Sequence, residues 1–125
     1  MSYQYLEYPK CTTCIKARKW LEKNQIAFES RDITVNNPTK EELKVWHEKS
    51  ELPLTKFFNT SGLLYREQNL KEKVKVMTAE EMVEILSTNG MLVKRPILLG
   101  DDFVLVGFKE DEWKKKLLPP VLKRY

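Results

Sequence analysis

The fold is decided by the run YQYLEYPKCTTCIKARKWL at residues 3–21. Aromatic residues alternate with others at its start and Pro9 ends the pattern, which predicts a short strand over residues 3–8. Residues 12–24 contain neither glycine nor proline, and their apolar side chains recur at helical spacing, which predicts a helix. The motif Cys11-Thr12-Thr13-Cys14 therefore stands where a strand ends and a helix begins.

The middle of the chain predicts a second strand followed by helices. Residues 27–33 fit a strand that ends in the turn formers Asn36-Asn37-Pro38. A helix that connects two strands favours their parallel pairing with a right-handed crossover. Capping-box spacing predicts that one helix begins at Thr39 and another at Thr78, with a helical turn and a loop over residues 52–62 between them.

The C-terminal part predicts a hairpin and a last helix. Apolar residues 97–99 and 103–106 flank an acidic turn, and residues 109–118 carry apolar side chains at helical spacing before Pro119-Pro120. The order is strand, helix, strand, helical insert, hairpin and helix. We expect one α/β domain over residues 1–125, with a mixed sheet of about four strands and a helical insert at about residues 39–90.

Composition indicates an ordinary globular protein. The 125 residues are 42% hydrophobic and 32% charged, with a net charge of +4. Most basic residues alternate with acidic ones, so no direct nucleic-acid binding is expected. Because no apolar run approaches the roughly 20 residues that cross a bilayer and no secretory signal opens the chain, we expect a cytoplasmic protein that does not contact membranes.

The two cysteines, Cys11 and Cys14, indicate redox chemistry or half of a metal site. A cysteine at a helix N-terminus is acidified by unpaired backbone amides and the helix dipole, so Cys11 is the candidate nucleophile. Cys14 lies one turn later on the apolar face, where it is placed to resolve a mixed disulfide at Cys11. A zinc site would need further ligands, and because His47 is the single histidine we expect no bound metal.

Four groups of residues together resemble a known family: Cys11-Thr12-Thr13-Cys14 with Lys16-Ala17-Arg18, then Pro38-Thr39-Lys40-Glu41-Glu42-Leu43, Arg95-Pro96-Ile97 before the hairpin, and Gly107-Phe108. They resemble the arsenate reductase and Spx family over nearly the whole chain. The resemblance implies a thioredoxin-like fold in which the Arg95-Pro96 bond is cis. It also implies that the planar guanidinium of Arg95 lies near Cys11, where it stabilises a thiolate or a bound oxyanion.

One branch of this family implies an enzyme. In an arsenate reductase Cys11 attacks arsenic, Arg95 offsets the negative charge and Cys14 supplies the second thiol. Glutathione, glutaredoxin or thioredoxin is the implied electron donor, a small oxyanion or a disulfide is the substrate, and no cofactor is bound. Arg66 and Arg18 are candidates for further oxyanion contacts. The sequence has Glu7-Tyr8 where reductases commonly carry His-Asn.

The other branch implies a regulator without catalysis. Spx-like proteins use the two cysteines as a redox switch and bind the C-terminal domain of the α subunit of RNA polymerase. A disulfide between Cys11 and Cys14 would remove a thiolate beside Arg95 and change local packing. Spx proteins carry a glycine in the insert that matters for this contact, and no glycine occurs around Ser50-Glu51-Leu52. The two functions remain open at this point.

Overall fold

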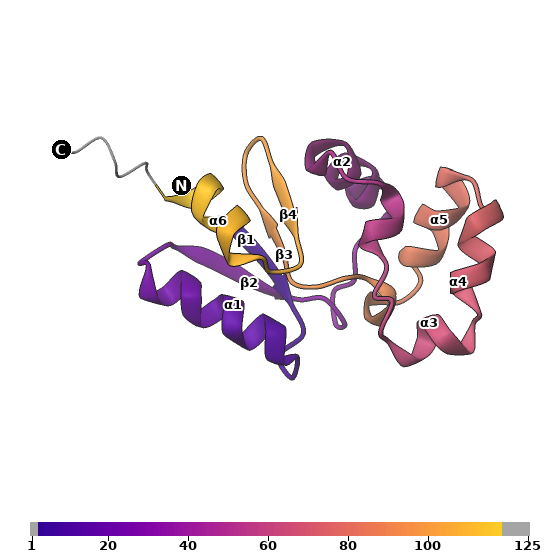
Figure 1. Cartoon of the computed structure of the whole chain (residues 1–125), viewed down its shortest axis with the longest axis horizontal. Helices are drawn as coiled ribbons and strands as arrows, with labels where there is room; N and C mark the ends of the chain where they lie inside the picture. Colours follow the sequence, from indigo (N-terminus) through magenta and orange to yellow (C-terminus); the bar gives the residue numbers. More distant parts are fainter. Residues whose placement is uncertain (1–2, 119–125) are drawn as a thin grey trace.

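The computed structural model describes residues 3–118, and their strands form a four-stranded mixed sheet in the order β2-β1-β3-β4 (Figure 1). Strand β1 (Tyr3–Glu7) pairs in parallel with β2 (Phe28–Asp32). On its other side β1 pairs antiparallel with β3 (Ile97–Leu99), and β3 pairs antiparallel with β4 (Val104–Val106). The mixed α/β sheet predicted from the sequence is confirmed.

Two helices cover one face of the sheet. They are α1 (Thr12–Lys23) and α6 (Glu110–Leu117), which lie together on one side in Figure 1. Tyr5 and Trp113 are fully buried in this layer, with ring centroids 6.4 Å apart in an edge-to-face arrangement. The indole Nε1 of Trp113 donates to the carbonyl of Gly107 at 3.1 Å, so the buried polar atom is satisfied. The last helix, α6, is therefore packed firmly against β1.

The helical insert lies on the other side of the sheet (Figure 1). It packs on the sheet through a shared apolar core that contains Leu6, Ile97 and Val104 from the strands together with Leu43 and Leu86 from the insert. Its elements are α2 (Lys40–Ser50), η1 (Leu54–Phe57), α3 (Leu63–Glu67), α4 (Leu70–Lys73), η2 (Val74–Val76), α5 (Ala79–Leu86) and η3 (Gly90–Leu92).

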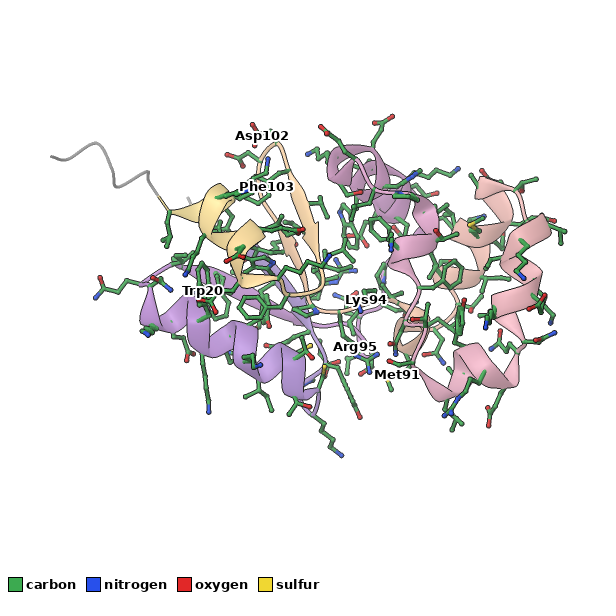
Figure 2. The ribbon with its side chains drawn as sticks, in the orientation of Figure 1. Trp20, Met91, Lys94, Arg95, Asp102 and Phe103 are labelled. Atoms are coloured by element: carbon green, nitrogen blue, oxygen red, sulfur yellow. The ribbon has the colours of Figure 1, made fainter. Side chains whose placement is uncertain are left out.

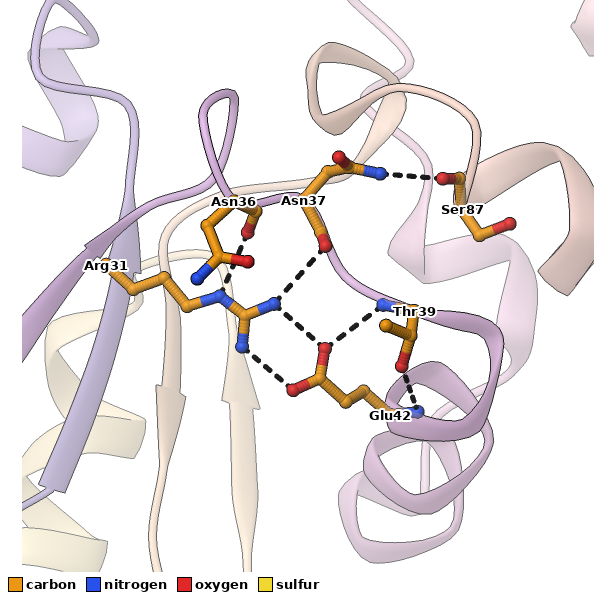
Figure 3. Close-up of polar contacts among 6 residues, drawn as sticks. All are labelled: Arg31, Asn36, Asn37, Thr39, Glu42 and Ser87. Atoms are coloured by element: carbon orange, nitrogen blue, oxygen red, sulfur yellow. Dashed lines mark hydrogen bonds and ion pairs between the residues drawn. The ribbon is translucent and has the colours of Figure 1, made fainter.

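Both predicted capping boxes are present, and the first belongs to a larger network (Figure 3). The Thr39 hydroxyl accepts from the Glu42 amide at 3.1 Å, and the Glu42 carboxylate accepts from the Thr39 amide at 3.0 Å. The same carboxylate accepts two bonds from the Arg31 guanidinium, at 2.8 and 2.9 Å. Asn37 donates to the Ser87 carbonyl at 2.6 Å. The end of β2 is thereby tied to α2 and to the end of α5.

The structure adds elements that the sequence pattern did not predict. Between residues 62 and 77, α3, α4 and η2 form three short helical segments. The second hairpin strand begins at Val104, one residue later than predicted. The predicted stop at Pro119-Pro120 lies outside the described residues. Within residues 3–118 there is no helix of the length and apolar character that spanning a membrane requires.

Candidate functional site

Cys11 is the N-cap residue of α1, as the sequence predicted for the candidate nucleophile. Its backbone is extended, with φ −82° and ψ 123°, and its carbonyl accepts the first helical bond from Ile15 at 3.0 Å. Its amide donates to the carbonyl of Tyr8 at 2.9 Å, which closes a tight turn between β1 and α1. The side chain is half-buried, and both cysteines are free thiols. Cys11 is thus accessible and rigidly held.

The Cys11 sulfur lies in an environment that stabilises its thiolate. Burial alone would raise the pKa of Cys11, but the influence of the backbone amide and thiol of Cys14 and of the Arg95 guanidinium lowers this pKa below the ordinary value. The positive charge of Arg95 lowers it further. Because the thiolate is the nucleophilic form, Cys11 has the character of a reactive cysteine.

Cys14 has the opposite character. Its side chain is fully buried on the face of α1 that packs against the sheet. Burial raises the pKa of Cys14 to about 12, and the neighbouring Cys11 sulfur raises it as well, while a backbone bond from Tyr8 and the charge of Arg95 oppose the rise. The Tyr5 hydroxyl fixes this turn of helix because it donates to the Cys14 carbonyl at 2.6 Å. Cys14 is therefore protonated at neutral pH.

Arg95 approaches the cysteines from the segment before β3. The bond between Arg95 and Pro96 is cis, the isomer that the resemblance implies. The guanidinium carbon lies 5.1 Å from the ring centroid of Tyr8, and Nη1 contacts the carbonyl of Met91 at 3.5 Å. Figure 2 places Arg95 and Met91 together between the sheet and the insert. Within residues 3–118 no carboxylate forms an ion pair with Arg95.

A cavity of about 340 Å³ opens beside Cys11. Its walls come from four separate parts of the chain: Cys11 and Thr13; Asn59, Ser61 and Gly62; Lys94 and Arg95; and Val106, Gly107, Phe108 and Lys109. Three cations and no carboxylate belong to this lining, so the cavity attracts anions. Its volume is in the range that holds a small organic molecule.

Backbone contacts fix the walls of this cavity relative to one another. The Lys94 amide donates to the carbonyl of Phe57 at 2.7 Å, which joins the insert to the segment that carries Arg95. The Gly107 amide donates to the carbonyl of Pro96 at 2.8 Å. Gly107 has φ 77°, a left-handed conformation that glycine adopts without strain and that turns the chain from β4 toward Lys109.

The other two arginines named from the sequence lie elsewhere. Arg18 forms an ion pair with Glu7, and its Nη2 also donates to the Ser30 hydroxyl at 2.6 Å. Glu7 is only 4% exposed, and a buried carboxylate needs a cationic partner, which explains where Arg18 points. Arg66 is exposed on α3. Neither side chain belongs to the cavity lining.

The single histidine, His47, lies in the helical insert. His47 lies on α2 and contacts the Phe57 ring edge-to-face, with centroids 6.2 Å apart. Within residues 3–118, no three His, Cys, Asp or Glu side chains gather closely enough to hold a metal ion.

Sequence reasoning missed the cavity residues that come from loops. Lys94 and Lys109 have one signal each, their positions next to Arg95 and next to Gly107-Phe108, whereas nothing in the pattern around Asn59 marks a site. In the sequence, Tyr8 is marked only by the Glu7-Tyr8 departure from the reductase pattern. The structure shows that its ring and its backbone both contact the dithiol site.

The sheet order and a dithiol at the start of the first helix define an α/β protein of the thioredoxin-like class. Within this class, residues 6–116 match the model of the ArsC family. Because this match spans most of the chain, the protein belongs to the ArsC family.

Solved structures agree with this assignment. A putative ArsC family related protein from Bacteroides fragilis is 53% identical and superposes with a TM-score of 0.90, covering 92% of this chain and 97% of that one. A possible arsenate reductase from Streptococcus mutans UA159 is 35% identical, with a TM-score of 0.82 over 90% of this chain and 97% of that one.

Curated relatives include both an uncharacterised protein and regulators. The chain is 50% identical to the uncharacterised protein YusI of Bacillus subtilis over 115 residues, which cover 92% of this chain and 98% of YusI. It is 35% identical to the global transcriptional regulator Spx of Streptococcus agalactiae over 104 residues, 83% of this chain and 74% of Spx. The proteins that this chain is similar to therefore include one described as a possible arsenate reductase and one described as a transcriptional regulator.

Proposed function

We propose that this protein is a cytoplasmic thiol-disulfide oxidoreductase in which Cys11 is the nucleophile, Cys14 resolves and Arg95 stabilises negative charge. The observation that carries the proposal is the opposite character of two neighbouring thiols. Cys11 is half-buried at the start of α1 beside Arg95, which favours its thiolate, whereas Cys14 is fully buried and remains protonated. A dithiol enzyme needs this difference, because one sulfur must react with the substrate while the other stays protonated until the mixed disulfide has formed.

The reaction with a disulfide substrate has two exchange steps. The Cys11 thiolate attacks one substrate sulfur, the substrate S–S bond breaks, and one thiolate leaves as a mixed disulfide forms. Cys14 then loses its proton and attacks the Cys11 sulfur, which releases the second thiol and leaves a Cys11–Cys14 disulfide. An external thiol reductant such as glutathione, glutaredoxin or thioredoxin supplies two electrons and two protons to regenerate both thiols.

The first exchange step prepares Cys14 for the second. After burial, the neighbouring Cys11 is among the causes that raise the pKa of Cys14. When the Cys11 sulfur enters a mixed disulfide it loses its negative charge, so this contribution disappears and Cys14 becomes more acidic. Cys14 is therefore activated when the mixed disulfide that it must attack has formed.

Arsenate is a candidate substrate for the same site. Cys11 would attack As(V) with loss of water, and attack of Cys14 on Cys11 would then leave the electron pair of the S–As bond on arsenic, releasing arsenite. A cavity with three cations and no lining carboxylate favours such an anion. Glu7, which stands where reductases carry a different residue, does not oppose binding because Arg18 neutralises it outside the cavity.

The test is turnover by purified protein with a coupled thiol reductant and either arsenate or a small disulfide. We expect consumption of reductant in proportion to substrate, with none for Cys11→Ser. Retention of turnover by Cys11→Ser would exclude Cys11 as the nucleophile. Absence of turnover with every donor, together with binding to the polymerase, would favour the second candidate.

The second candidate is a redox-sensing regulator that binds the C-terminal domain of the α subunit of RNA polymerase. The observation that favours it is the 35% identity with a transcriptional regulator over 83% of this chain. Co-purification with that isolated polymerase domain, compared between the dithiol and the disulfide forms, tests this function. Redox-dependent binding without turnover would establish it.

A further inference from the structure

We propose that Tyr8 is a positioning residue whose ring holds the Arg95 guanidinium beside the Cys11 sulfur. The inference deepens the proposed function, since it explains what keeps the cation of the dithiol site in place. The guanidinium carbon is 5.1 Å from the centroid of the Tyr8 ring, within the range of cation–π contacts. The side chain of Tyr8 is half-buried against the apolar core that the insert shares with the sheet.

The backbone of Tyr8 connects the same residue to both thiols. Its carbonyl accepts from the Cys11 amide at 2.9 Å. Its backbone also lies close enough to the Cys14 thiol to lower the pKa of that thiol. The ring that contacts Arg95 therefore belongs to the same turn as the two cysteines. If Arg95 moves away from this ring, it also moves away from Cys11.

The chemistry of the contact explains why a ring serves better than an acid here. A carboxylate would hold Arg95 more strongly but would cancel most of its charge, as Glu7 does for Arg18. The face of an aromatic ring attracts a cation through its quadrupole and carries no net charge. The remaining contacts of Nη1 are with the carbonyl of Met91 at 3.5 Å and with its sulfur at 3.9 Å. All three partners are neutral, so the full charge of Arg95 is available to Cys11.

The charged groups that face Cys11 are few, which makes the effect measurable. Lys94, Arg95 and Lys109 line the cavity beside it, and Cys14 lies three residues along the same helix. Of these groups, Cys14 and Arg95 lower the pKa of Cys11, against the effect of burial. A change in Tyr8 that releases Arg95 must therefore appear in the titration of Cys11.

The experiment measures the rate of Cys11 alkylation by iodoacetamide against pH, with mass spectrometry to localise the label. We expect Tyr8→Leu to raise the midpoint pH of Cys11 alkylation by about half a pH unit or more. At a pH below the midpoint, this shift corresponds to about a threefold loss of the Cys11 thiolate. Tyr8→Phe retains the ring and should keep the wild-type midpoint. In an Arg95→Gln background, where the cation is absent, Tyr8→Leu should cause no further shift.

A second comparison remains informative if Tyr8→Leu does not fold. Tyr8→Phe is prepared with an ordinary ring and with a perfluorinated ring, which has nearly the same shape but a reversed quadrupole. We expect the fluorinated ring to raise the Cys11 midpoint relative to the ordinary one. An unchanged midpoint, or an equal shift in the Arg95→Gln background, would overturn the role of Tyr8. If Cys11 of the wild-type protein does not react with iodoacetamide, that result would instead contradict the proposed function.

Discussion

The backbone amide of Cys14 and the guanidinium of Arg95 both lower the pKa of the half-buried Cys11, whereas Cys14 is fully buried and its pKa is raised. This difference follows from where each residue stands in the helix. The N-cap position exposes Cys11 to unpaired amides, and the position three residues later turns Cys14 toward the sheet.

The first prediction concerns trapping of an intermediate. Cys14→Ser removes the resolving thiol, so a mixed disulfide formed at Cys11 has no internal route to release. We expect mass spectrometry to find substrate thiol bound to Cys11 and multi-turnover activity to be lost. Cys11→Ser, the matched control, should trap nothing. Full multi-turnover activity of Cys14→Ser without a trapped species would show that another thiol resolves.

The second prediction concerns pH. Because the pKa of Cys11 is lowered and that of Cys14 is raised to about 12, the two thiols should be alkylated in different pH ranges. Labelling of Cys11 should rise with pH with a midpoint below the ordinary thiol pKa of 9.0. Cys14 should remain unlabelled there unless the protein is unfolded. Equal labelling of both thiols at neutral pH would contradict the assigned roles.

At the scale of elements, the contact between Arg18 and Glu7 joins α1 to β1, and Ser30 extends it to β2. Arg18→Ala leaves the Glu7 carboxylate buried without its cation. Because Arg18 is itself 35% exposed, we expect a loss of about 2 kcal/mol rather than the larger cost of breaking a fully buried pair.

Chemical denaturation of Arg18→Ala measures this loss. The control is Lys19→Ala, one residue along the same helix at an exposed position, which should change stability little. The Cys11 alkylation midpoint should stay near wild type, because Arg18 does not line the cavity. If Arg18→Ala raised the midpoint pH of Cys11 alkylation by as much as Arg95→Gln does, Arg18 would have to act on the Cys11 thiol as well.

The elements differ in how well local sequence predicts them. Helix α1 was predicted from its apolar periodicity, and the helices begun by Thr39 and Thr78 were predicted from their capping boxes. Helices α3 and α4 have only five and four residues, too few for periodicity to emerge. Asn69 separates them with φ 53°, a left-handed conformation that sequence pattern does not reveal at that position.

At the scale of the molecule, the cavity beside Cys11 exists only because the insert and the hairpin meet the start of α1. Cys11 and Arg95 were predicted to meet through the family resemblance. Lys94, Lys109 and Asn59 come from separate segments whose approach depends on long-range packing, so their participation was not predicted. The strands and the insert share one apolar core, and the single domain over residues 1–125 stays a prediction.

The charge of this cavity gives a further prediction. Lys94→Gln with Lys109→Gln removes two of its three cations and leaves Arg95 in place. We expect the reaction of Cys11 with a carboxylate-bearing aromatic disulfide to slow several-fold at low ionic strength, and its reaction with a neutral dipyridyl disulfide to change little. Lys16→Gln with Lys19→Gln, on exposed positions of α1, is the matched control for net charge. Equal slowing with both reagents would mean that the lysines do not select anions.

The most direct test of the central claim is a redox titration of Cys11 and Cys14. Wild-type protein is equilibrated at defined ratios of reduced and oxidised glutathione, free thiols are trapped, and mass spectrometry counts the label on each cysteine. We expect a reversible intramolecular disulfide near the cytosolic redox poise, with both thiols lost together. If no Cys11–Cys14 disulfide forms at any ratio, the dithiol mechanism is wrong, and so is the redox switch of the regulator.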